Sequence, residues 1–322
     1  MAYHARMKAL LITGGGGGAR LAAGFAASLD PDDLTILVNT GDDERIRGLH
    51  ISPDVDTILY YLSGLVDWQR GWGLQKESFS ANDRYRELVV ASGLENDMQE
   101  WFALGDRDLA THMFRTRLLD SGRPLSDATA GLGRALGCEV RVLPMSDDAV
   151  STVLTTSSGD ELDFQTYFVR HQHRDEITDV TYEGIESARP APGALDAIEA
   201  ADVIVFGPSN PMLSIGPVLA VPGVRAAIVA SRSARVAVSP IVGGKAIKGP
   251  ADMLLFSLGH EISCVGIARI YQSLVDVFVL DTVDAQRRGE IEALGMGTIV
   301  CDTMMPGPDE AARLAREIID GL

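Results

Sequence analysis

The sequence is poor in residues that cross-link a chain or anchor it in a membrane. Its 322 residues include only three cysteines, Cys138, Cys264 and Cys301, with no C-x-x-C pair. Neither a disulfide framework nor a thiolate zinc site is therefore expected. The apolar run that follows Met1–Lys8 ends at Ile12, too short for a signal peptide, and no other stretch reaches the roughly 18 apolar residues of a membrane span. We expect a cytoplasmic protein that does not enter a membrane.

Positive charge is scarce as well. The chain has 28 Lys and Arg against 45 Asp and Glu, a formal net charge of −17. A protein that grips a polyanion needs a basic face, so this composition argues against nucleic-acid binding. Hydrophobic residues at 46% and charged residues at 23% are typical of a folded globular protein.

Short apolar strands alternate with helical patterns at both ends of the chain. The expected strands are 9–13, 34–38, 201–206, 225–230, 277–281 and 297–301, and a closing helix is expected over 309–322. Continuous apolar runs are typical of parallel strands covered on both faces. The pattern predicts an α/β fold with a doubly wound, mainly parallel Rossmann-like sheet.

The middle of the chain departs from this pattern. All three tryptophans and several helical patterns lie within residues 64–137, which we interpret as a helical insertion or cap. Residues 1–63 and 138–322 would form the nucleotide-binding core. Within the second part, β-branched and aromatic residues predict a small β excursion at about 151–184, including a strand over 165–170.

A run of five glycines directly follows the first strand: Gly14, Gly15, Gly16, Gly17 and Gly18. Backbone N–H groups without neighbouring Cβ atoms can converge on an anion, and the helix expected over 19–29 adds the positive end of its dipole. No Gly-Lys-Ser/Thr follows, which excludes a Walker A loop. The run predicts a phosphate-binding turn, with a tight turn that holds no ligand as the alternative.

Four carboxylates lie on two loops near the end of the second strand. Asp42 and Asp43 directly follow Asn39-Thr-Gly, and Asp54 and Asp56 follow Ser52-Pro. Oxygen ligands without His or Cys suit Mg²⁺ that is held partly by substrate phosphates. The alternative is that Asp54 or Asp56 caps the helix containing residues 58–62.

Two later loops are also rich in polar groups. Ser209, Asn210 and Ser214 offer donors and acceptors suited to a base edge or a phosphate, although a self-satisfied Asx turn would also explain them. Lys245 and Lys248, close to glycines in an otherwise acidic chain, predict a local anion site, with ordinary surface lysines as the alternative.

Two blocks of the middle segment could contact a substrate. Asp106, Asp108 and His112 lie in one charged stretch, where Asp108 and His112 have helical i,i+4 spacing, and structural ion pairing would explain them equally well. Trp72 is flanked by Gly71 and Gly73, which can leave an aromatic face open for stacking on a flat ring, with core packing as the alternative.

Taken in order, these blocks resemble the 2-phospho-L-lactate transferase family of coenzyme F(420) biosynthesis. The resemblance rests on eight blocks: the glycine run before Ala19-Arg20, and residues 39–43, 53–57, 71–73, 104–112, 208–211, 214–217 and 239–244. It departs from many relatives in the unbroken glycine run, where we would expect a bulkier residue.

The resemblance implies a Mg²⁺-dependent phosphotransferase. Its donor would be a guanosine diphosphate ester of a three-carbon acid (lactyl, enolpyruvyl or glyceryl), and its acceptor the ribityl hydroxyl of the deazaflavin Fo, with release of GMP. It further implies a homodimer. The metal would be held by Asp42 and Asp56 first, and then by Asp43 and Asp54. The diphosphate would be bound by the five glycines and Arg20, and the nucleotide by Ser209, Asn210, Ser214, Gly216 and Lys245. Trp72, Asp106 and His112 would lie near the acceptor, and Asp43, Asp106 or His112 would accept its proton.

Two other functions are weighed against this one. A regulatory protein of the same superfamily would bind a sugar nucleotide without catalysis, but it should not need the block at 106–112 or Trp72. A nicotinamide oxidoreductase would place an acidic residue for the ribose at the end of the second strand, where this chain has Asn39-Thr40.

Overall fold

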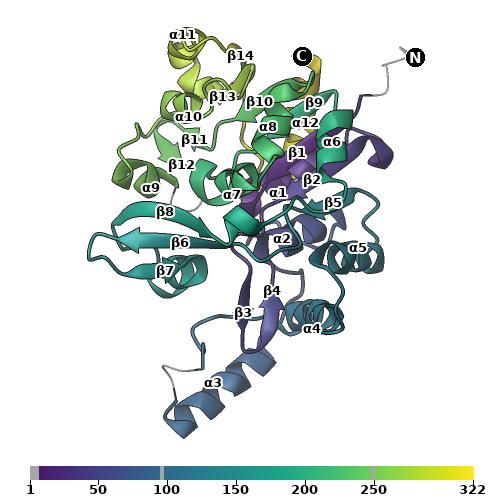
Figure 1. Cartoon of the computed structure of the whole chain (residues 1–322), viewed down its shortest axis with the longest axis vertical. Helices are drawn as coiled ribbons and strands as arrows, with labels where there is room; N and C mark the ends of the chain where they lie inside the picture. Colours follow the sequence, from purple (N-terminus) through teal and green to yellow (C-terminus); the bar gives the residue numbers. More distant parts are fainter. Residues whose placement is uncertain (1–6, 95–97, 248–250) are drawn as a thin grey trace.

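The computed structural model describes residues 7–94, 98–247 and 251–322 and is built around one parallel sheet (Figure 1). Its seven strands lie in the order β14-β13-β10-β9-β1-β2-β5. Their bounds are β1 Ala9–Thr13, β2 Leu34–Val38, β5 Arg141–Pro144, β9 Val203–Phe206, β10 Ala234–Val238, β13 Val277–Asp281 and β14 Gly297–Cys301. This confirms the predicted doubly wound α/β fold.

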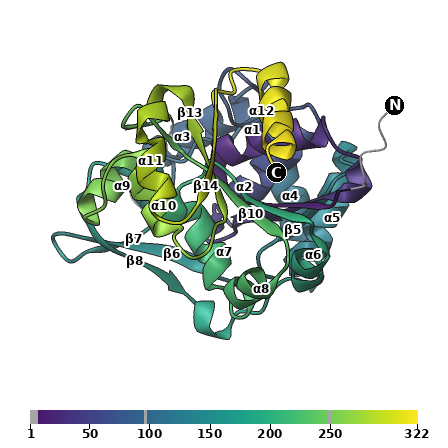
Figure 2. The ribbon, with the colours of Figure 1, turned by 90° about the horizontal axis from the view of Figure 1, so that it is seen from above.

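Helices cover both faces of the sheet (Figure 2). One face packs against α1 (Gly15–Ala26), α2 (Pro53–Leu62), α5 (Leu125–Leu136) and α12 (Pro308–Asp320). The other packs against α6 (Ala194–Ala200), α7 (Gly216–Ala220), α8 (Val224–Ala230), α10 (Cys264–Ile270) and α11 (Arg288–Glu292). Because every residue of β1 and β9 is buried, these strands needed continuous apolar sequences.

The order in which strands are added to the sheet reverses at its centre, on the two sides of β1. From β1 the chain continues to β2 on one side, and it later returns to β9 on the other, with Ala9 opposite both Leu34 and Val203. The carboxyl ends of these three strands therefore meet at one edge. Open α/β sheets bind ligands at such a switch point.

Shorter elements surround this edge. The hairpin of β3 (Glu44–Ile46) and β4 (Leu49–Ile51) follows β2, and α3 (Ser80–Ser92) and α4 (Asp106–Asp120) follow α2. The predicted β excursion is a three-stranded antiparallel sheet of β6 (Ser151–Thr156), β7 (Glu161–Asp163) and β8 (Ile177–Glu183). The remaining elements are the hairpin of β11 (Ile241–Val242) and β12 (Lys245–Ala246), and the helix α9 (Ala251–Ser257).

Three local predictions are corrected by the structure. Residues 225–230 lie in helix α8, which buries only Val224 and Ile228 on one face, because an apolar run rich in alanine suits a helix as well as a strand. The strand is β10 instead. Residues Thr166–Arg170 form a π-helix turn rather than a strand. The first helix begins at Gly15 and ends at Ala26, so the glycines form its first turn.

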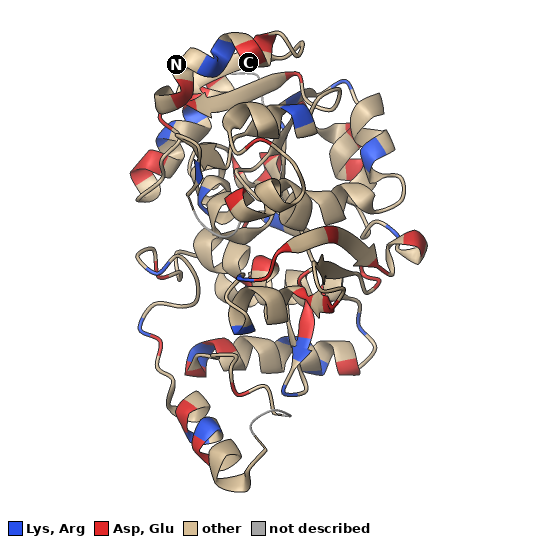
Figure 3. Ribbon diagram, turned by 90° about the vertical axis from the view of Figure 1, so that its left-hand side faces the viewer, with Lys and Arg blue, Asp and Glu red and all other residues tan. Residues whose placement is uncertain are grey.

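In the view of Figure 3, the ribbon segments of Lys and Arg are interspersed with those of Asp and Glu, and no continuous basic stripe is visible. In the described ranges, no single helix is both long enough and apolar enough to cross a membrane. A pair, Pro211–Ala220 and Val224–Ala230, passes by length and composition but is bent by 87°. Ile215, Val218 and Ile228 of this pair are fully buried in the core.

Candidate functional site

The glycine turn is shaped by backbone geometry and by crowding. Gly15 has φ 68°, a left-handed conformation that favours glycine. A Cβ at Gly14 would collide with Asp54 Oδ2 and lie 3.1 Å from the Cβ of Asn39. The run thus lets the start of α1 approach the loops that follow β2 and begin α2.

Asp54 lies in the first turn of α2 and caps a different helix, α1. Its Oδ1 accepts a hydrogen bond from Gly15 N at 2.6 Å, and its Oδ2 accepts one from Asn39 Nδ2 at 2.9 Å. Burial raises the pKa of this carboxyl to about 6, while these two donors act in the opposite direction. The alternative that Asp54 caps the helix in which it lies is therefore wrong: α2 has no side-chain cap among the described residues, and Asp54 caps the start of α1.

Asp42 and Asp43 form an acidic pair at the carboxyl end of β2. Burial raises the pKa of Asp42 well above its usual value, and the nearby charges of Asp54 and Asp43 raise it further. The pKa of Asp43 is also raised by burial, although His50 opposes this. Among the described residues, Oδ1 of Asp42 and Oδ1 of Asp43 are buried without a hydrogen-bond partner. Unpaired buried carboxylate oxygens are costly, and a divalent cation with a preference for oxygen ligands fits them.

Asp43 is oriented by two donors through its other oxygen. Ser52 Oγ donates to Asp43 Oδ2 at 2.6 Å, and His50 Nε2 lies 3.1 Å from the same atom. The sequence analysis did not identify His50. The β3–β4 hairpin brings His50, which lies on β4, close to the acidic loop. The two strands of this hairpin have only three residues each, too few to give a recognisable pattern in the sequence.

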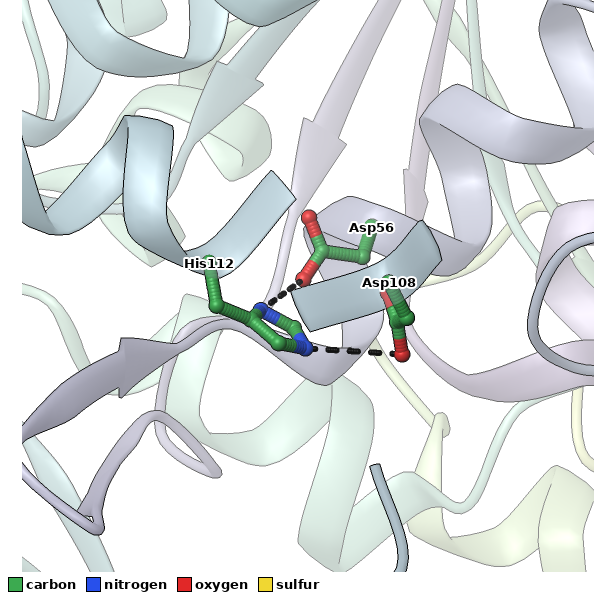
Figure 4. Close-up of side chains that lie close together, drawn as sticks. All are labelled: Asp56, Asp108 and His112. Carbon is green, nitrogen blue, oxygen red and sulfur yellow. Dashed lines mark ion pairs between the residues drawn. The ribbon is translucent and has the colours of Figure 1, made fainter. Parts of the chain in front are cut away.

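A second polar cluster links α2 to α4 (Figure 4). His112 Nδ1 lies 3.5 Å from Asp56 Oδ2, and His112 Nε2 lies 3.4 Å from Asp108 Oδ2. These three residues could offer ligand atoms to one metal ion. However, Arg115, which is fully buried, contacts both carboxylate oxygens of Asp56 and already neutralises its charge. The sequence analysis missed Arg115, although its i,i+3 spacing from His112 was a usable signal.

The loop after β9 lies against the glycine turn. Ser209 Oγ donates to the carbonyl of Gly14 at 2.8 Å and lies 3.0 Å from Thr13 Oγ1. Asn210 Oδ1 accepts hydrogen bonds from the amides of Met212 and Leu213, which is the predicted Asx-type alternative. Its Nδ2 is buried and has no partner within the described part of the chain, so it retains a donor for a ligand.

Ser214 and Gly216 continue the same wall of the site. Ser214 is buried, and its Cβ lies 3.0 Å from the position that a Cβ at Gly14 would occupy. A side chain at Gly216 would collide with the hydroxyl of Tyr182. Tyr182 in turn is close enough to Asp42 for the charge of that carboxylate to raise the Tyr182 pKa, after the larger effect of burial.

The loop that carries Trp72 approaches the glycine turn from the other side. A Cβ at Gly16 would lie 3.2 Å from the carbonyl oxygen of Gly71. Trp72 itself is 47% exposed, and the Arg70 guanidinium lies over its ring at 5.1 Å from the centroid. This exposure argues against core packing, and stacking on a substrate ring stays a prediction.

Two other predicted residues, Arg20 and Asp106, have structural partners. Arg20 donates to the Tyr61 hydroxyl and to the carbonyls of Trp68 and Met305, so it anchors the Trp72 loop. Asp106 caps α3: its carboxylate accepts hydrogen bonds from Ser78 Oγ and from the amides of Ser80 and Ala81, which lower its pKa. Lys245 is exposed on β12, and Lys248 lies outside the described residues. Ligand contacts by these residues stay predictions.

The fold and the site define a class of protein. A glycine-rich helix start, a pair of buried carboxylates and a polar loop meet at the switch point of a parallel sheet, as in α/β proteins that bind phosphorylated ligands. The family model for 2-phospho-L-lactate transferase CofD matches residues 10–303. The chain belongs to this family and is a transferase of coenzyme F(420) biosynthesis.

The related enzymes carry one of two names, phosphoenolpyruvate transferase or 2-phospho-L-lactate transferase. A phosphoenolpyruvate transferase of Streptomyces griseus is 41% identical, with 98% of each chain covered. A 2-phospho-L-lactate transferase of Methanosarcina mazei is 36% identical over 96% of this chain and 99% of that protein. A crystal structure of a UPF0052 family protein from Bacillus halodurans is similar in fold, with a TM-score of 0.63, 18% identity and coverage of 98% of this chain and 99% of that one.

Proposed function

We propose that this protein transfers a phospho-(three-carbon acid) group from a guanosine diphosphate ester to the terminal ribityl hydroxyl of Fo, with release of GMP. The observation that carries the proposal is the meeting of three loops at one edge of the sheet. There Ser209 donates to the carbonyl of Gly14 at the start of α1. On the other side, Gly15 donates to Asp54, which accepts from Asn39 of the loop that carries the Asp42–Asp43 pair. Transfer at phosphorus depends on positioning and charge neutralisation, which such a site can supply.

The proposed donor site divides between the two ends of the nucleotide. The amides of the glycine turn and the dipole of α1 would hold the diphosphate. Ser209, Asn210, Ser214 and Gly216 would contact the guanosine, and the buried Nδ2 of Asn210 supports this because it lacks another acceptor among the described residues. Lys245 would add positive charge at the rim.

The acceptor would lie on the opposite side of the glycine turn. Trp72 would stack on the deazaflavin ring, because its loop contacts the turn and the residue is about half exposed, at 47%. The α4 residues Asp106 and His112 would border this site. We assign acceptance of the ribityl proton to Asp43, since Ser52 and His50 fix one carboxylate oxygen and leave Oδ1 free.

The residues present suit Mg²⁺. Asp42 would hold the ion together with phosphate oxygens of the donor, since its Oδ1 is buried and without a partner in the described ranges. Asp56 is the second candidate, provided that Arg115 releases one carboxylate oxygen. When bound, the ion would neutralise charge on the diphosphate and on the departing GMP.

For the acid, we propose phosphoenolpyruvate. Relatives named phosphoenolpyruvate transferase are 37% to 41% identical to this chain, and those named 2-phospho-L-lactate transferase are 36% to 37% identical. The lactyl ester differs from the enolpyruvyl ester by reduction of the double bond, and the glyceryl ester by addition of water across it. The identity of relatives, rather than a single side chain, supports this choice.

The direct test is incubation of the purified protein with Fo, Mg²⁺ and each of the three guanosine diphosphate esters. Mass spectrometry should detect a phosphoenolpyruvyl-Fo product, with GMP released in equal amount. GMP release that does not depend on Fo would contradict the transferase proposal. Faster transfer from the lactyl or glyceryl ester would contradict only the proposed acid.

A homodimer, testable by light scattering, and a cytoplasmic location are further proposals.

A further inference from the structure

Asp54 joins two parts of the site that are distant in sequence. Its carboxylate is only 7% exposed and uses both oxygens, one for Gly15 N at 2.6 Å and the other for Asn39 Nδ2 at 2.9 Å. Gly15 begins α1, while Asn39 follows β2. A single side chain of α2 is therefore bonded to the glycine turn and to the start of the acidic loop.

Asn39 extends this connection to the acidic pair. Its Oδ1 accepts a hydrogen bond from the amide of Gly41 at 2.8 Å, and its Nδ2 also donates to the carbonyl of Leu213 at 3.2 Å. The side chain is fully buried. A continuous path of hydrogen bonds thus runs from Gly15 through Asp54 and Asn39 to Gly41, the residue before Asp42.

Packing leaves this path little freedom. A Cβ at Gly14 would meet Asp54, Asn39 and Ser214 at once, so the three side chains and the turn are in close contact. Asp54 also differs from its acidic neighbours. Asp42 and Asp43 each have a buried oxygen without a partner in the described part of the chain, whereas both oxygens of Asp54 accept short bonds.

We infer that Asp54 is a positioning residue and not a metal ligand: it fixes the glycine turn relative to the Asp42–Asp43 loop through Gly15 and Asn39. The diphosphate-binding amides and the metal-binding carboxylate are then held at one separation before the donor arrives. The functional consequence rests on the proposed function. The structural coupling does not, and it can be measured without any ligand.

The first experiment is amide hydrogen exchange of the full chain without metal or nucleotide. In Asp54→Ala we expect exchange to rise about tenfold in both residues 14–18 and residues 40–43, because both segments lose a fixed partner. Asp54→Asn keeps an acceptor for Gly15 N and should show a smaller rise. Faster exchange confined to residues 14–18 would indicate a simple helix cap and would overturn the inference.

Asp281→Ala is the matched control. Asp281 is also a buried carboxylate at the end of a strand, 2% exposed, and it accepts bonds from the amides of Val283 and Thr303. Its loss should speed exchange near residues 281–303 but not in residues 14–18 or 40–43. An equal effect of both variants on the site loops would mean general destabilisation and would overturn the inference.

The second experiment measures Mn²⁺ binding by electron paramagnetic resonance and GDP binding in Mg²⁺ by calorimetry. We expect Asp54→Asn to keep the Mn²⁺ Kd within about threefold of the unmodified protein, whereas Asp42→Asn weakens it at least about tenfold. GDP affinity should fall about tenfold in Asp54→Ala and be partly restored in Asp54→Asn. Loss of Mn²⁺ binding in Asp54→Asn equal to that in Asp42→Asn would show that Asp54 is a ligand.

If the unmodified protein transferred nothing to Fo, the proposed function would fail, while the exchange result would still decide the role of Asp54.

Discussion

Arg115 of α4 contacts both carboxylate oxygens of Asp56 on α2, and the two side chains are 0% and 6% exposed. This pair ties the segment between residues 64 and 137 to the core helix that carries two of the site's acidic residues. Its partners are 59 positions apart in the sequence. The strength of the connection depends on burial, because a buried charge without its partner is far more costly than an exposed one.

Arg115→Leu should therefore destabilise the protein by about 3–5 kcal/mol, since it leaves the Asp56 carboxylate buried without the guanidinium that contacts both of its oxygens. Urea unfolding followed by circular dichroism measures this free energy. Arg45→Leu is the control, because the Arg45–Asp120 pair is exposed and should contribute less than about 1 kcal/mol. Similar losses in the two variants would contradict the role given to the buried pair.

Asp42→Asn should reduce transfer to Fo by at least about a hundredfold, because the proposed metal loses an anionic ligand. The fold should be retained. In chelator, the variant should melt at the same temperature or higher, since it removes a buried charge that lies near Asp43 and Asp54. Unchanged activity, or a lower melting temperature in chelator, would argue against this account of Asp42.

Gly14→Ala should weaken binding of GDP in Mg²⁺ by about tenfold or more, because the added methyl group collides with Asp54 and the turn must move. Calorimetric titration gives the affinity. Gly289→Ala in α11 is the matched control, as a Cβ there meets no atom within 4 Å. It should leave GDP binding unchanged, and a helix-interior alanine should be neutral or stabilising by up to about 1 kcal/mol.

Trp72→Ala should raise the KM for Fo about three- to tenfold, the range expected when one aromatic contact is lost. The KM for the guanosine diphosphate ester should stay the same, because Trp72 is assigned to the acceptor alone. Steady-state kinetics with each substrate varied in turn separates the two. Phe256→Ala, which removes another exposed ring at 72% exposure, is expected to change neither constant.

Glu44 should make the metal-free protein less stable as the pH rises. Burial, followed by the nearby charge of Asp163, raises the pKa of Glu44 from 4.5 to about 8. The folded state therefore binds more protons than the unfolded state between these values, and stability falls as the pH increases through that window. The unmodified protein should lose free energy of unfolding between pH 5 and pH 8. After allowance for solvent screening, we expect this loss to be about 1–2 kcal/mol smaller in Glu44→Gln.

Urea unfolding at the two pH values in the presence of chelator tests this expectation. Glu161→Gln, an exposed substitution on the neighbouring β7 strand, should retain the pH dependence of the unmodified protein. A steeper decline in Glu44→Gln than in the unmodified protein would reverse the predicted sign.

The sequence by itself determined the sheet and much of its chemistry. Apolar runs such as 9–13 and 34–38 can only be strands or buried helices, and the glycines and aspartates that follow them fall at the carboxyl edge of any parallel sheet. The same ambiguity explains the error at 225–230, where an alanine-rich apolar run suited a helix and a strand alike.

Only the tertiary structure decided which polar groups are partners. Asp54 bonds Gly15 from 39 positions away, and Asp56 meets Arg115 across 59. Residue type and local spacing show that a carboxylate needs a partner, but not which of several equally suitable groups the packing of α1, α2 and α4 will bring to it. Because the energy of a buried charge depends on that choice, the fold decided which aspartates have both oxygens satisfied and which retain a free one for a ligand.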